Sequence, residues 1–388
     1  MDVGTARWLV SADAGPALAA AAAEPDPGSL AAAERLRRLE PPEHAAAALT
    51  QAALRRKASA KFGDSAPSLF LTKDGLEQAT RADVARWRAG RFAAAGAKTV
   101  VDLGCGIGAD ALAFLHAGLD VVAVEADPVT AVLAEANLGR PVIVADATEV
   151  AAGLLRDGAA VFVDPARRTS AGRTWRVEDL SPPWAFATGL LAGRVGCLKA
   201  APGLPSGFLP AEVAAVWVSH SGDLVETSLW SGAGVPGSRT ALLLPSGHEL
   251  DAGVRAEPVV GPPASYLYEP DPAVIRSGAV AALAERLGAY TLASRVAYLT
   301  ADELVVSPFA TAFEVLDVLA FDERTLRAWV REHSVGSLEI KVRGLDVDPA
   351  ILRRKLKPRG GASATLVLTP TVDGARALVA RRVTQTST

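Results

Sequence analysis

Nine residues, VVDLGCGIG at positions 100–108, constrain the fold of this chain more than any other feature. Val100 and Val101 belong to an apolar run that predicts a strand, and Asp102 is an acid inside that run. Glycines follow at alternate positions, 104, 106 and 108. Glycine lacks the Cβ that would collide with a ligand near the backbone, and a helix predicted from about Ala109 directs its N–H groups to the same place. The run therefore predicts a strand, a ligand-binding turn and a helix.

Three further predicted strands each end in an acid. LDVVAVEADP places Glu125 at the carboxyl end of a strand, where a carboxylate can accept hydrogen bonds from both hydroxyls of a ribose. PVIVAD ends in Asp146, which can accept a hydrogen bond from an adenine amino group, and AAVFVDPARR ends in Asp164–Pro165. The glycine run also satisfies the looser fingerprint of dinucleotide-binding folds. The acids that follow it therefore have to decide whether the predicted ligand is a nicotinamide cofactor or another nucleoside.

The order of Asp102, glycine turn, Glu125, Asp146 and Asp164 resembles motifs I to IV of the class I S-adenosylmethionine (SAM)-dependent methyltransferases. A dinucleotide-binding fold needs neither an acid inside its first strand nor Asp-Pro after its fourth, so the sequence favours SAM as the cofactor. The residues that we predict to bind SAM are Thr80, Asp102, Gly104, Cys105, Gly106, Gly108, Glu125, Ala126, Asp146 and Ala147.

Composition excludes several other classes of protein. The 388 residues suffice for two or three domains with substantial cores, and the net charge of −3 gives no general attraction to nucleic acid. Two cysteines, Cys105 and Cys197, are too few for a disulfide framework or a thiolate zinc site. The five histidines show no ligand spacing, and we predict no metal site.

The first residues indicate neither export nor a membrane segment. MDVGTARWLV lacks the basic and apolar regions of a signal peptide. The alanine run at 17–23 is too short to cross a bilayer, and Glu24 and Pro25 interrupt it. We therefore expect a cytoplasmic protein that does not bind a membrane.

The chain divides into three predicted regions, at 1–92, 93–262 and 263–388. Residues 1–60, rich in Ala, Leu and Arg, predict three short helices, with Ser29 as the cap of the second. Residues 61–89 predict a loop and an amphipathic helix, which either closes over the methionine end of SAM or packs on the sheet. Its candidates for a contact with SAM are Gly75, Glu77, Gln78 and Thr80.

Alternating strands and helices over 98–245 predict an α/β fold with a doubly wound, Rossmann-like parallel sheet. We place strands five, six and seven at 195–203, 212–221 and 240–245, with the last pair forming an antiparallel edge. Gly261–Pro262–Pro263 marks a boundary, after which a turn and a helix are predicted.

The C-terminal segment is locally basic. Ten Lys and Arg residues stand against four Asp and Glu between positions 339 and 382, interleaved with strand-like runs. Such a small α+β module can dock RNA, whereas a charge run by itself is also typical of a solvated surface. The candidate substrate-binding residues here are Lys341, Arg343, Arg353, Arg354 and Lys355.

The whole arrangement resembles a bacterial class I methyltransferase family with a C-terminal THUMP-like domain. The resemblance rests on LEQAT (76–80), DLGCGIG, DPARR (164–168), EPDPAVIRSG (269–278), EIKVRG (339–344) and LRRKLKPRG (352–360). The methyltransferase part is also distantly similar to trimethylguanosine synthases. True THUMP domains capture structured RNA for a joined catalytic domain, and the resemblance implies this role by analogy.

The segment after the fourth strand predicts the acceptor site. Asp164 can hold or deprotonate an acceptor, and with Pro165 and Arg167 it forms the predicted catalytic set. Arg168 is a candidate to bind a substrate phosphate or carboxylate, or to pair with a nearby acid. The usual N-methyltransferase motif continues with Pro and an aromatic residue, which are absent here. We interpret Ser181–Pro182–Pro183–Trp184, which has similar letters, as a loop away from the sheet edge.

Three hypotheses follow from these patterns. The first is an RNA methyltransferase that acts on a nitrogen or oxygen atom, since no Pro-Cys pair supplies the thiolate that methylation at pyrimidine carbon 5 requires. The second is a small-molecule methyltransferase whose C-terminal domain caps the pocket. The third is a SAM-binding protein without turnover.

Overall fold

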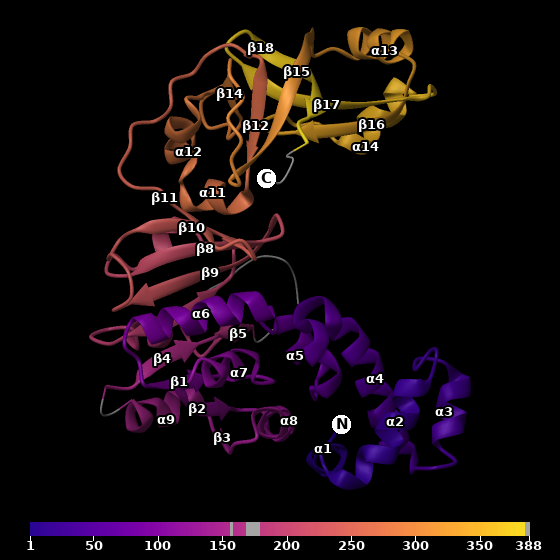
Figure 1. Ribbon diagram of the computed structural model, residues 1–388, viewed down its shortest axis with the longest axis vertical. Coiled ribbons are helices and arrows are strands. Elements are labelled where there is room, and N and C mark those ends of the chain that lie inside the picture. The colour runs from indigo at the N-terminus through magenta and orange to yellow at the C-terminus, as the bar shows by residue number, and fades with distance from the viewer. Residues whose placement is uncertain (156–157, 168–178, 385–388) are drawn as a thin grey trace. The chain divides into compact units, whose positions relative to one another are not determined.

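Strand β1 (Thr99–Leu103) forms where the sequence predicts a strand and lies in the middle of the parallel part of its sheet. It pairs with β2 (Asp120–Glu125) on one side and β4 (Ala160–Val163) on the other. β3 (Val142–Val144) continues the sheet beyond β2, and β7 (Gly196–Ala200) continues it beyond β4. Every residue of β4 is buried, as expected for a strand covered on both faces. The computed structural model therefore confirms the predicted doubly wound α/β fold (Figure 1).

A strand that the sequence did not predict lies next to β7. β9 (Asp223–Ser231) runs antiparallel beside β7, between it and β8 in the strand order, while the strand predicted at residues 240–245 is present. Those residues form β10 (Arg239–Leu244), which pairs antiparallel with β11 (His248–Asp251) and is next to β8 (Ala214–His220) in the strand order. β9 was missing from the predicted strands because it carries Glu226, Thr227 and Ser228 at buried positions and does not look like a core strand.

Helices connect the parallel strands. After β1, β2 and β3 come α7 (Ala109–His116), α8 (Pro128–Leu138) and α9 (Ala147–Leu154). α6 (Ala82–Ala94) precedes β1 and packs against α7, where the rings of Phe92 and Phe114 meet at 5.3 Å. α10 (Trp184–Gly189) precedes β7. α7, α8, α9 and α10 lie in the crossover connections that a parallel sheet needs.

The N-terminal region contains more helix than predicted. Its helices are α1 (Val3–Leu9), α2 (Gly15–Ala23), α3 (Leu30–Leu36) and α4 (Pro42–Phe62), the last of 21 residues. The expectation of three short helices was wrong, whereas the Ser29 cap is confirmed, since its side chain accepts a hydrogen bond from the N–H of Ala32. Alanines of α2, α3 and α4 form a buried cluster in which small side chains let the helices approach closely. Within the described residues, no helix is both long and apolar enough to cross a membrane.

The structure describes residues 1–155, 158–167 and 179–384, and these form two units. The first comprises Met1–Ala215 with Glu226–Gly237, and the second comprises Val216–Val225 with Ser238–Thr388. The N-terminal helices thus belong to the same unit as the parallel sheet. The domain limits at residues 92 and 262 stay a prediction, because compactness does not test where separately folding domains begin and end.

The second unit contains a seven-stranded sheet with the order β13-β14-β12-β15-β18-β17-β16. Its strands are β12 (Tyr266–Pro270), β13 (Tyr290–Thr291), β14 (Leu299–Ala301), β15 (Ala310–Ala320), β16 (Val335–Val342), β17 (Ala362–Thr371) and β18 (Gly374–Arg382). The predicted turn and helix after residue 269 are the end of β12 followed by α11 (Pro272–Ser277) and α12 (Val280–Leu287).

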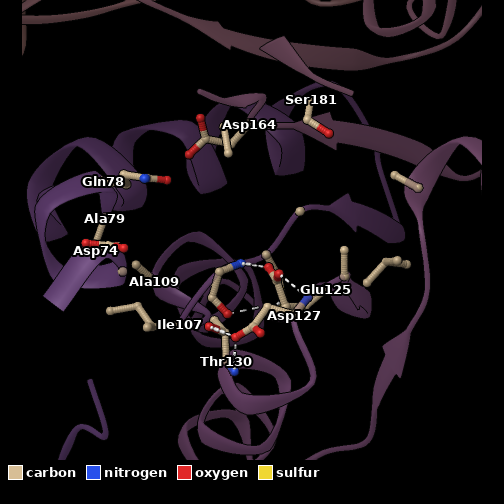
Figure 2. Close-up of a pocket in the computed structure, with 18 of the residues that line it drawn as sticks. Asp74, Gln78, Ala79, Ile107, Ala109, Glu125, Asp127, Thr130, Asp164 and Ser181 are labelled. Carbon is tan, nitrogen blue, oxygen red and sulfur yellow. Dashed lines mark hydrogen bonds between the residues drawn. The ribbon is translucent and has the colours of Figure 1, made fainter. Parts of the chain in front are cut away.

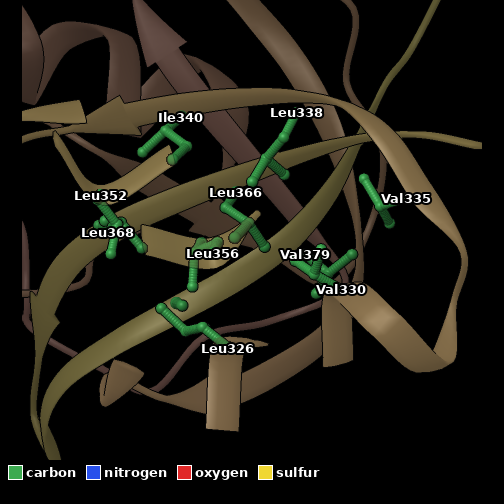
Figure 3. Close-up of a cluster of buried hydrophobic side chains, with 11 residues drawn as sticks. Leu326, Val330, Val335, Leu338, Ile340, Leu352, Leu356, Leu366, Leu368 and Val379 are labelled. Carbon is green, nitrogen blue, oxygen red and sulfur yellow. The ribbon is translucent and has the colours of Figure 1, made fainter. Parts of the chain in front are cut away.

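Helices α13 (Glu323–Glu332) and α14 (Pro349–Leu356) pack against this sheet. Leu326 and Val330 of α13 and Leu356 of α14 are buried against Leu366 and Val379 of the central strands (Figure 3). Alternate residues of β16 point into the same core, which leaves their neighbours on the opposite face. This α+β arrangement confirms the predicted class of the C-terminal part.

An ion cluster centred on Arg88 joins the sheet of the first unit to its helices. Arg88 of α6 is fully buried, and its guanidinium donates to the carboxylates of Asp110 on α7 and Glu226 on β9. It also lies over the ring of Phe162 at 4.7 Å. Burial raises the pKa of Glu226, but the nearby charges of Arg88 and Lys199 and the hydrogen bonds to the carboxylate together lower it. A single buried cation therefore compensates acids from two elements.

Replacing Arg88 with Met is expected to destabilise the first unit by about 3–5 kcal/mol, because two carboxylates then stay buried without their partner. Urea unfolding followed by intrinsic fluorescence measures this change. Arg86→Met on the same helix is the matched control. Arg86 pairs with Asp83 and its side chain is 70% exposed, so its loss is expected to cost less than about 1 kcal/mol. Equal effects of the two variants would contradict a structural role for the cluster.

Candidate active site

The glycine turn after β1 is shaped by its backbone. The N–H groups of Gly104 and Cys105 both donate to the carbonyl of Val124 at 2.9 Å, which bends the chain sharply over β2. Gly104 has a φ of +88°, and a Cβ there would lie 3.4 Å from the carbonyl oxygen of Asp164. Gly106 also has a positive φ, +55°. The turn therefore requires glycine for its backbone conformation.

A pocket of about 520 Å³ opens at the carboxyl ends of β1, β2, β3 and β4 (Figure 2). This is the place where open parallel sheets bind their ligands. The structure brings most of the predicted SAM-binding residues into its lining. Those residues are Thr80, Gly104, Cys105, Gly106, Glu125, Ala126, Asp146 and Ala147.

Glu125 is held in place by the glycine turn itself. Its Oε2 accepts the N–H of Gly106 and its Oε1 accepts the N–H of Asp127, each at 2.9 Å. Burial raises the pKa of Glu125, and these backbone hydrogen bonds oppose that rise. Each carboxylate oxygen retains a further lone pair that can accept a ribose hydroxyl. The geometry thus fits the predicted role.

Asp146 and Thr80 complete the polar lining. Asp146 caps α9, where its Oδ1 accepts hydrogen bonds from the N–H and hydroxyl of Thr148 at 2.8 and 2.6 Å. Thr80 is buried, and its hydroxyl has no hydrogen-bond partner within the described part of the chain. A buried hydroxyl without a partner costs free energy, which a polar ligand in the pocket would recover. The residues present therefore fit a nucleoside cofactor such as SAM.

Two predicted ligands, Asp102 and Gly108, lie outside the pocket lining that the described residues form. Asp102 is fully buried on β1, and neither of its carboxylate oxygens has a hydrogen-bond partner among those residues. Burial first, and then the nearby charges of Asp110 and Asp164, hold the pKa of Asp102 well above its usual range. Gly108 begins α7 with a φ of +84°, and a Cβ there would crowd Leu138. The positions of both residues favour structural roles.

The segment before β1 also reaches the pocket. Gly75, Gln78 and Thr80 line it, and the first two belong to the short helix α5 (Lys73–Gln78). Glu77, the fourth candidate of this segment, is exposed and lies outside the lining drawn from the described residues. Of the two interpretations of residues 61–89, α5 fits a contact with the cofactor, while α6 packs within the fold.

Asp164 lines the pocket at the end of β4 and is paired with a lysine that the sequence analysis missed. Lys199 Nζ donates to Asp164 Oδ2 at 2.7 Å, and the two side chains are 14% and 28% exposed. Burial raises the pKa of Asp164, while the Lys199 charge opposes the rise. A signal was present, because Lys199 is the one charged residue of the apolar strand GCLKA.

Ser181 and Pro182 line the same pocket as Asp164, so our interpretation of this segment as a distant loop was wrong. The backbone of Ala166–Arg167 forms β5, which pairs antiparallel with Leu180–Ser181 in β6. This small ribbon carries Ser181 to the sheet edge, which a count of strand ends along the sequence cannot predict. Pro165 directly follows Asp164, the backbone of Arg167 belongs to β5, and Arg168 lies outside the described residues.

The predicted cations of the second unit do not form one free cluster. Lys341 donates to Glu269 at 2.8 Å, and Arg343 lies 3.9 Å from the same carboxylate and over the ring of Tyr298. Arg353 donates to the carbonyl of Leu338. Arg354 and Lys355 are exposed in the last turn of α14, and Lys355 is 3.5 Å from Glu323. Exposed positive charge is thus concentrated on α14.

Cys105 lines the pocket, but neither cysteine is exposed as a nucleophile. Cys105 and Cys197 are buried free thiols, and burial raises the pKa of Cys197 to about 12. A thiol with such a pKa stays protonated and is a poor nucleophile at neutral pH. No three His, Cys, Asp or Glu side chains lie together as a metal site within residues 1–155, 158–167 and 179–384.

A doubly wound sheet with this glycine turn, Glu125 and an acid after β4 defines a SAM-dependent methyltransferase. Comparison with known proteins supports this class. The chain is 36% identical over 335 residues to an uncharacterized S-adenosylmethionine-dependent methyltransferase of Mycobacterium tuberculosis, found in two strains. The alignment covers 81% of this chain and 90% of the relative. The chain belongs to the family of this methyltransferase, and its cofactor is SAM.

Other comparisons concern the fold and the terminal regions. A putative methyltransferase from Porphyromonas gingivalis W83 has a solved structure with the same fold, at a TM-score of 0.74 and 24% identity. The match covers 89% of this chain and 92% of that one. A family model described as THUMP domain-like matches residues 310–382, and one described as a domain of unknown function (DUF8688) matches residues 2–58. The suspected family with its C-terminal THUMP-like domain is confirmed.

Replacing Glu125 with Ala is expected to weaken binding of S-adenosylhomocysteine by about 10- to 100-fold, because charge-assisted hydrogen bonds of about 1.5–3 kcal/mol are removed. Isothermal titration calorimetry measures the affinity. Asp120→Ala is the matched control, since Asp120 is an exposed acid at the other end of β2. An unchanged affinity in Glu125→Ala would contradict a role for Glu125 in holding the ribose.

Replacing Asp102 with Asn is expected to stabilise the protein more at high pH than at low pH. The folded state keeps the Asp102 proton to a higher pH than the unfolded chain does, so this group's contribution to stability falls as the pH rises through the raised pKa. Asparagine has no such proton. Melting temperatures of both proteins between pH 5 and 8 test this, at about 2–4 °C per kcal/mol. A constant difference across that range would show that Asp102 is ionised when folded.

Proposed function

We propose that this methyltransferase modifies RNA, with its C-terminal THUMP-like part docking the substrate. The observation that carries the proposal is the THUMP domain-like match at residues 310–382 in a chain that also holds a SAM pocket. True THUMP domains capture structured RNA for a joined catalytic domain. RNA and SAM are both available in the cytoplasm, which we propose as the location.

Exposed charge on α14 supports an RNA contact. Arg353, Arg354 and Lys355 occupy the last turn of α14, and Lys357 and Arg359 follow it. Cations on an exposed surface attract phosphates without reading base sequence. Lys341 and Arg343 share Glu269, and their side chains are only 20% and 31% exposed, so we assign them a smaller part of the docking. Lys355 also lies near an acid, Glu323, but its side chain is 56% exposed. Arg354 and Lys355 are therefore the residues whose removal should matter most.

Asp164 is the residue that we propose to hold the acceptor atom. SAM, when bound, supplies a methyl group on a positively charged sulfur, and the enzyme has to align a nucleophile with that group. Asp164 Oδ2 accepts from Lys199, and its Oδ1 can accept a hydrogen from an amine or hydroxyl. A nitrogen or oxygen acceptor fits this arrangement. Pro165 and Arg167 complete the proposed catalytic set, and we propose Arg168, which lies outside the described residues, as a residue that binds the substrate.

A labelling experiment tests the proposal. The protein is incubated with methyl-tritiated SAM and with total cellular RNA from a strain that lacks the protein, and transfer of tritium to the RNA is measured. We expect label that survives protease and is removed by ribonuclease, and its absence with Asp164→Asn. Digestion to nucleosides then identifies the methylated atom. If calorimetry shows cofactor binding but the RNA stays unlabelled, the RNA proposal is wrong. Label in a metabolite extract would then indicate a small-molecule enzyme, and no label at all a SAM-binding protein without turnover.

Removing charge from α14 is expected to weaken RNA binding selectively. In Arg354→Ala/Lys355→Ala, KM for RNA should rise about 10-fold at low salt with kcat kept. The logarithmic salt dependence should fall by about 1 for each phosphate that the variant no longer neutralises. Arg37→Ala/Arg38→Ala removes two exposed cations from the N-terminal region and is the matched control. Equal KM values for both double variants would contradict docking by α14.

A further inference from the structure

The short helix α5 at the pocket has its end fixed by two lysines. The last carbonyl groups of a helix have no partners inside the helix. Lys61 Nζ donates to the carbonyls of Leu76, Glu77 and Ala79 at 2.7, 2.8 and 2.9 Å. The carbonyl of Gln78, between them, accepts a hydrogen bond from Lys199 Nζ at 3.1 Å. Two ammonium groups thus satisfy the carbonyls of four consecutive residues.

Lys199 makes a second contact that Lys61 does not share. The same ammonium group donates to Asp164 Oδ2 at 2.7 Å, whereas the three hydrogen bonds of Lys61 all go to the end of α5. Gln78 and Asp164 are both wall residues of the SAM pocket, and Figure 2 shows them on the same side of it. They come from segments on either side of β1 in the sequence. Lys199, whose side chain is 14% exposed, is the group that joins them.

The charges of Lys199 and Asp164 depend on each other. Burial lowers the pKa of Lys199, but the carboxylates of Asp164, Glu226 and Asp110 together outweigh burial and raise it. Burial likewise raises the pKa of Asp164, and Lys199 opposes that rise. Neutralising Asp164 therefore removes the first of the charges that keep Lys199 protonated. When Lys199 is less fully protonated, its hydrogen bond to the carbonyl of Gln78 is weaker.

We propose that Lys199 is a positioning residue that couples the α5 wall of the pocket to the acceptor carboxylate of Asp164. A bound ligand that orders α5 then also fixes the position of Asp164. In the other direction, a substitution at Asp164 makes α5 less ordered. The proposal rests on the SAM pocket and on the acceptor role proposed for Asp164. It does not depend on RNA being the substrate.

Hydrogen exchange tests the coupling between α5 and Asp164. Exchange is measured on the full-length chain by mass spectrometry of peptides that cover residues 70–80. Lys199→Met keeps the length of the side chain and removes its donors. We expect about 10-fold faster exchange at the end of α5 and about 10-fold weaker binding of S-adenosylhomocysteine, because a charge-assisted hydrogen bond is removed. Lys199→Arg retains the charge and is expected to restore part of both. Lys199→Met with wild-type exchange in α5 would overturn the proposal.

Asp164→Asn separates coupling from local damage. Asp164 lies outside α5, yet its variant is expected to speed exchange in α5 several-fold when Lys199 is present. It should add nothing in the Lys199→Met background. Lys61→Met is the control background, because it removes hydrogen bonds to α5 and leaves the contact between Lys199 and Asp164 intact. In that background, Asp164→Asn should still speed exchange in α5. An equal effect of Asp164→Asn in the wild-type and Lys199→Met backgrounds, or none in the wild type, would overturn the coupling.

The measurements stay decisive if one variant or the RNA proposal fails. If Lys199→Met does not fold, the exchange of α5 in Asp164→Asn alone decides, since an unchanged rate excludes the link. Failure of the RNA proposal shows as unlabelled RNA with the wild-type protein. The exchange and binding experiments use S-adenosylhomocysteine and no acceptor, so that failure leaves their result unaffected.

Discussion

The fully buried guanidinium of Arg88 is the interaction on which the architecture of the first unit depends. It holds Asp110 on α7 and Glu226 on β9, so helices and sheet share one cation. Burying these charges costs several kcal/mol of desolvation, which the mutual attraction offsets only with good geometry. Asp110 also lines the SAM pocket. The ion pairs of Arg88 therefore reach the lining of the SAM pocket at Asp110. Lys199, which pairs with Asp164, adds a second buried cation on the acceptor side.

Negative charge is concentrated around this network, and the protein manages it in two ways. Arg88 and Lys199 compensate Asp110, Glu226 and Asp164 directly. Asp102 has no such partner in the described chain, and burial together with the nearby acids holds its pKa well above its usual range. An acid inside β1 thus need not be a charged ligand of the cofactor. A raised pKa favours the neutral form, which adds no further negative charge to the protein interior.

Much of the cofactor site could be predicted from the sequence because its residues follow strand ends. Gly104, Glu125, Asp146 and Asp164 each lie at or just after the end of an apolar run, and parallel strands bring their carboxyl ends to one edge. The missed features lack that regularity. β9 was not recognised because Glu226 looks polar without Arg88, and Ser181 was misplaced because a two-residue ribbon, β5 with β6, sets its position. Such pairs are visible only once the chain is folded.

Lys199 shows why the acceptor side of the pocket is harder to predict than the cofactor side. The cofactor side is built largely from backbone N–H groups and glycine conformations, which leave a recognisable sequence pattern. The acceptor side depends on the charge of one carboxylate, and that charge depends on a lysine 35 positions away and on Glu226 behind it. The motif Asp164–Pro165 therefore identifies the acceptor residue but not its protonation or orientation. Both depend on buried charged residues that lie elsewhere in the sequence.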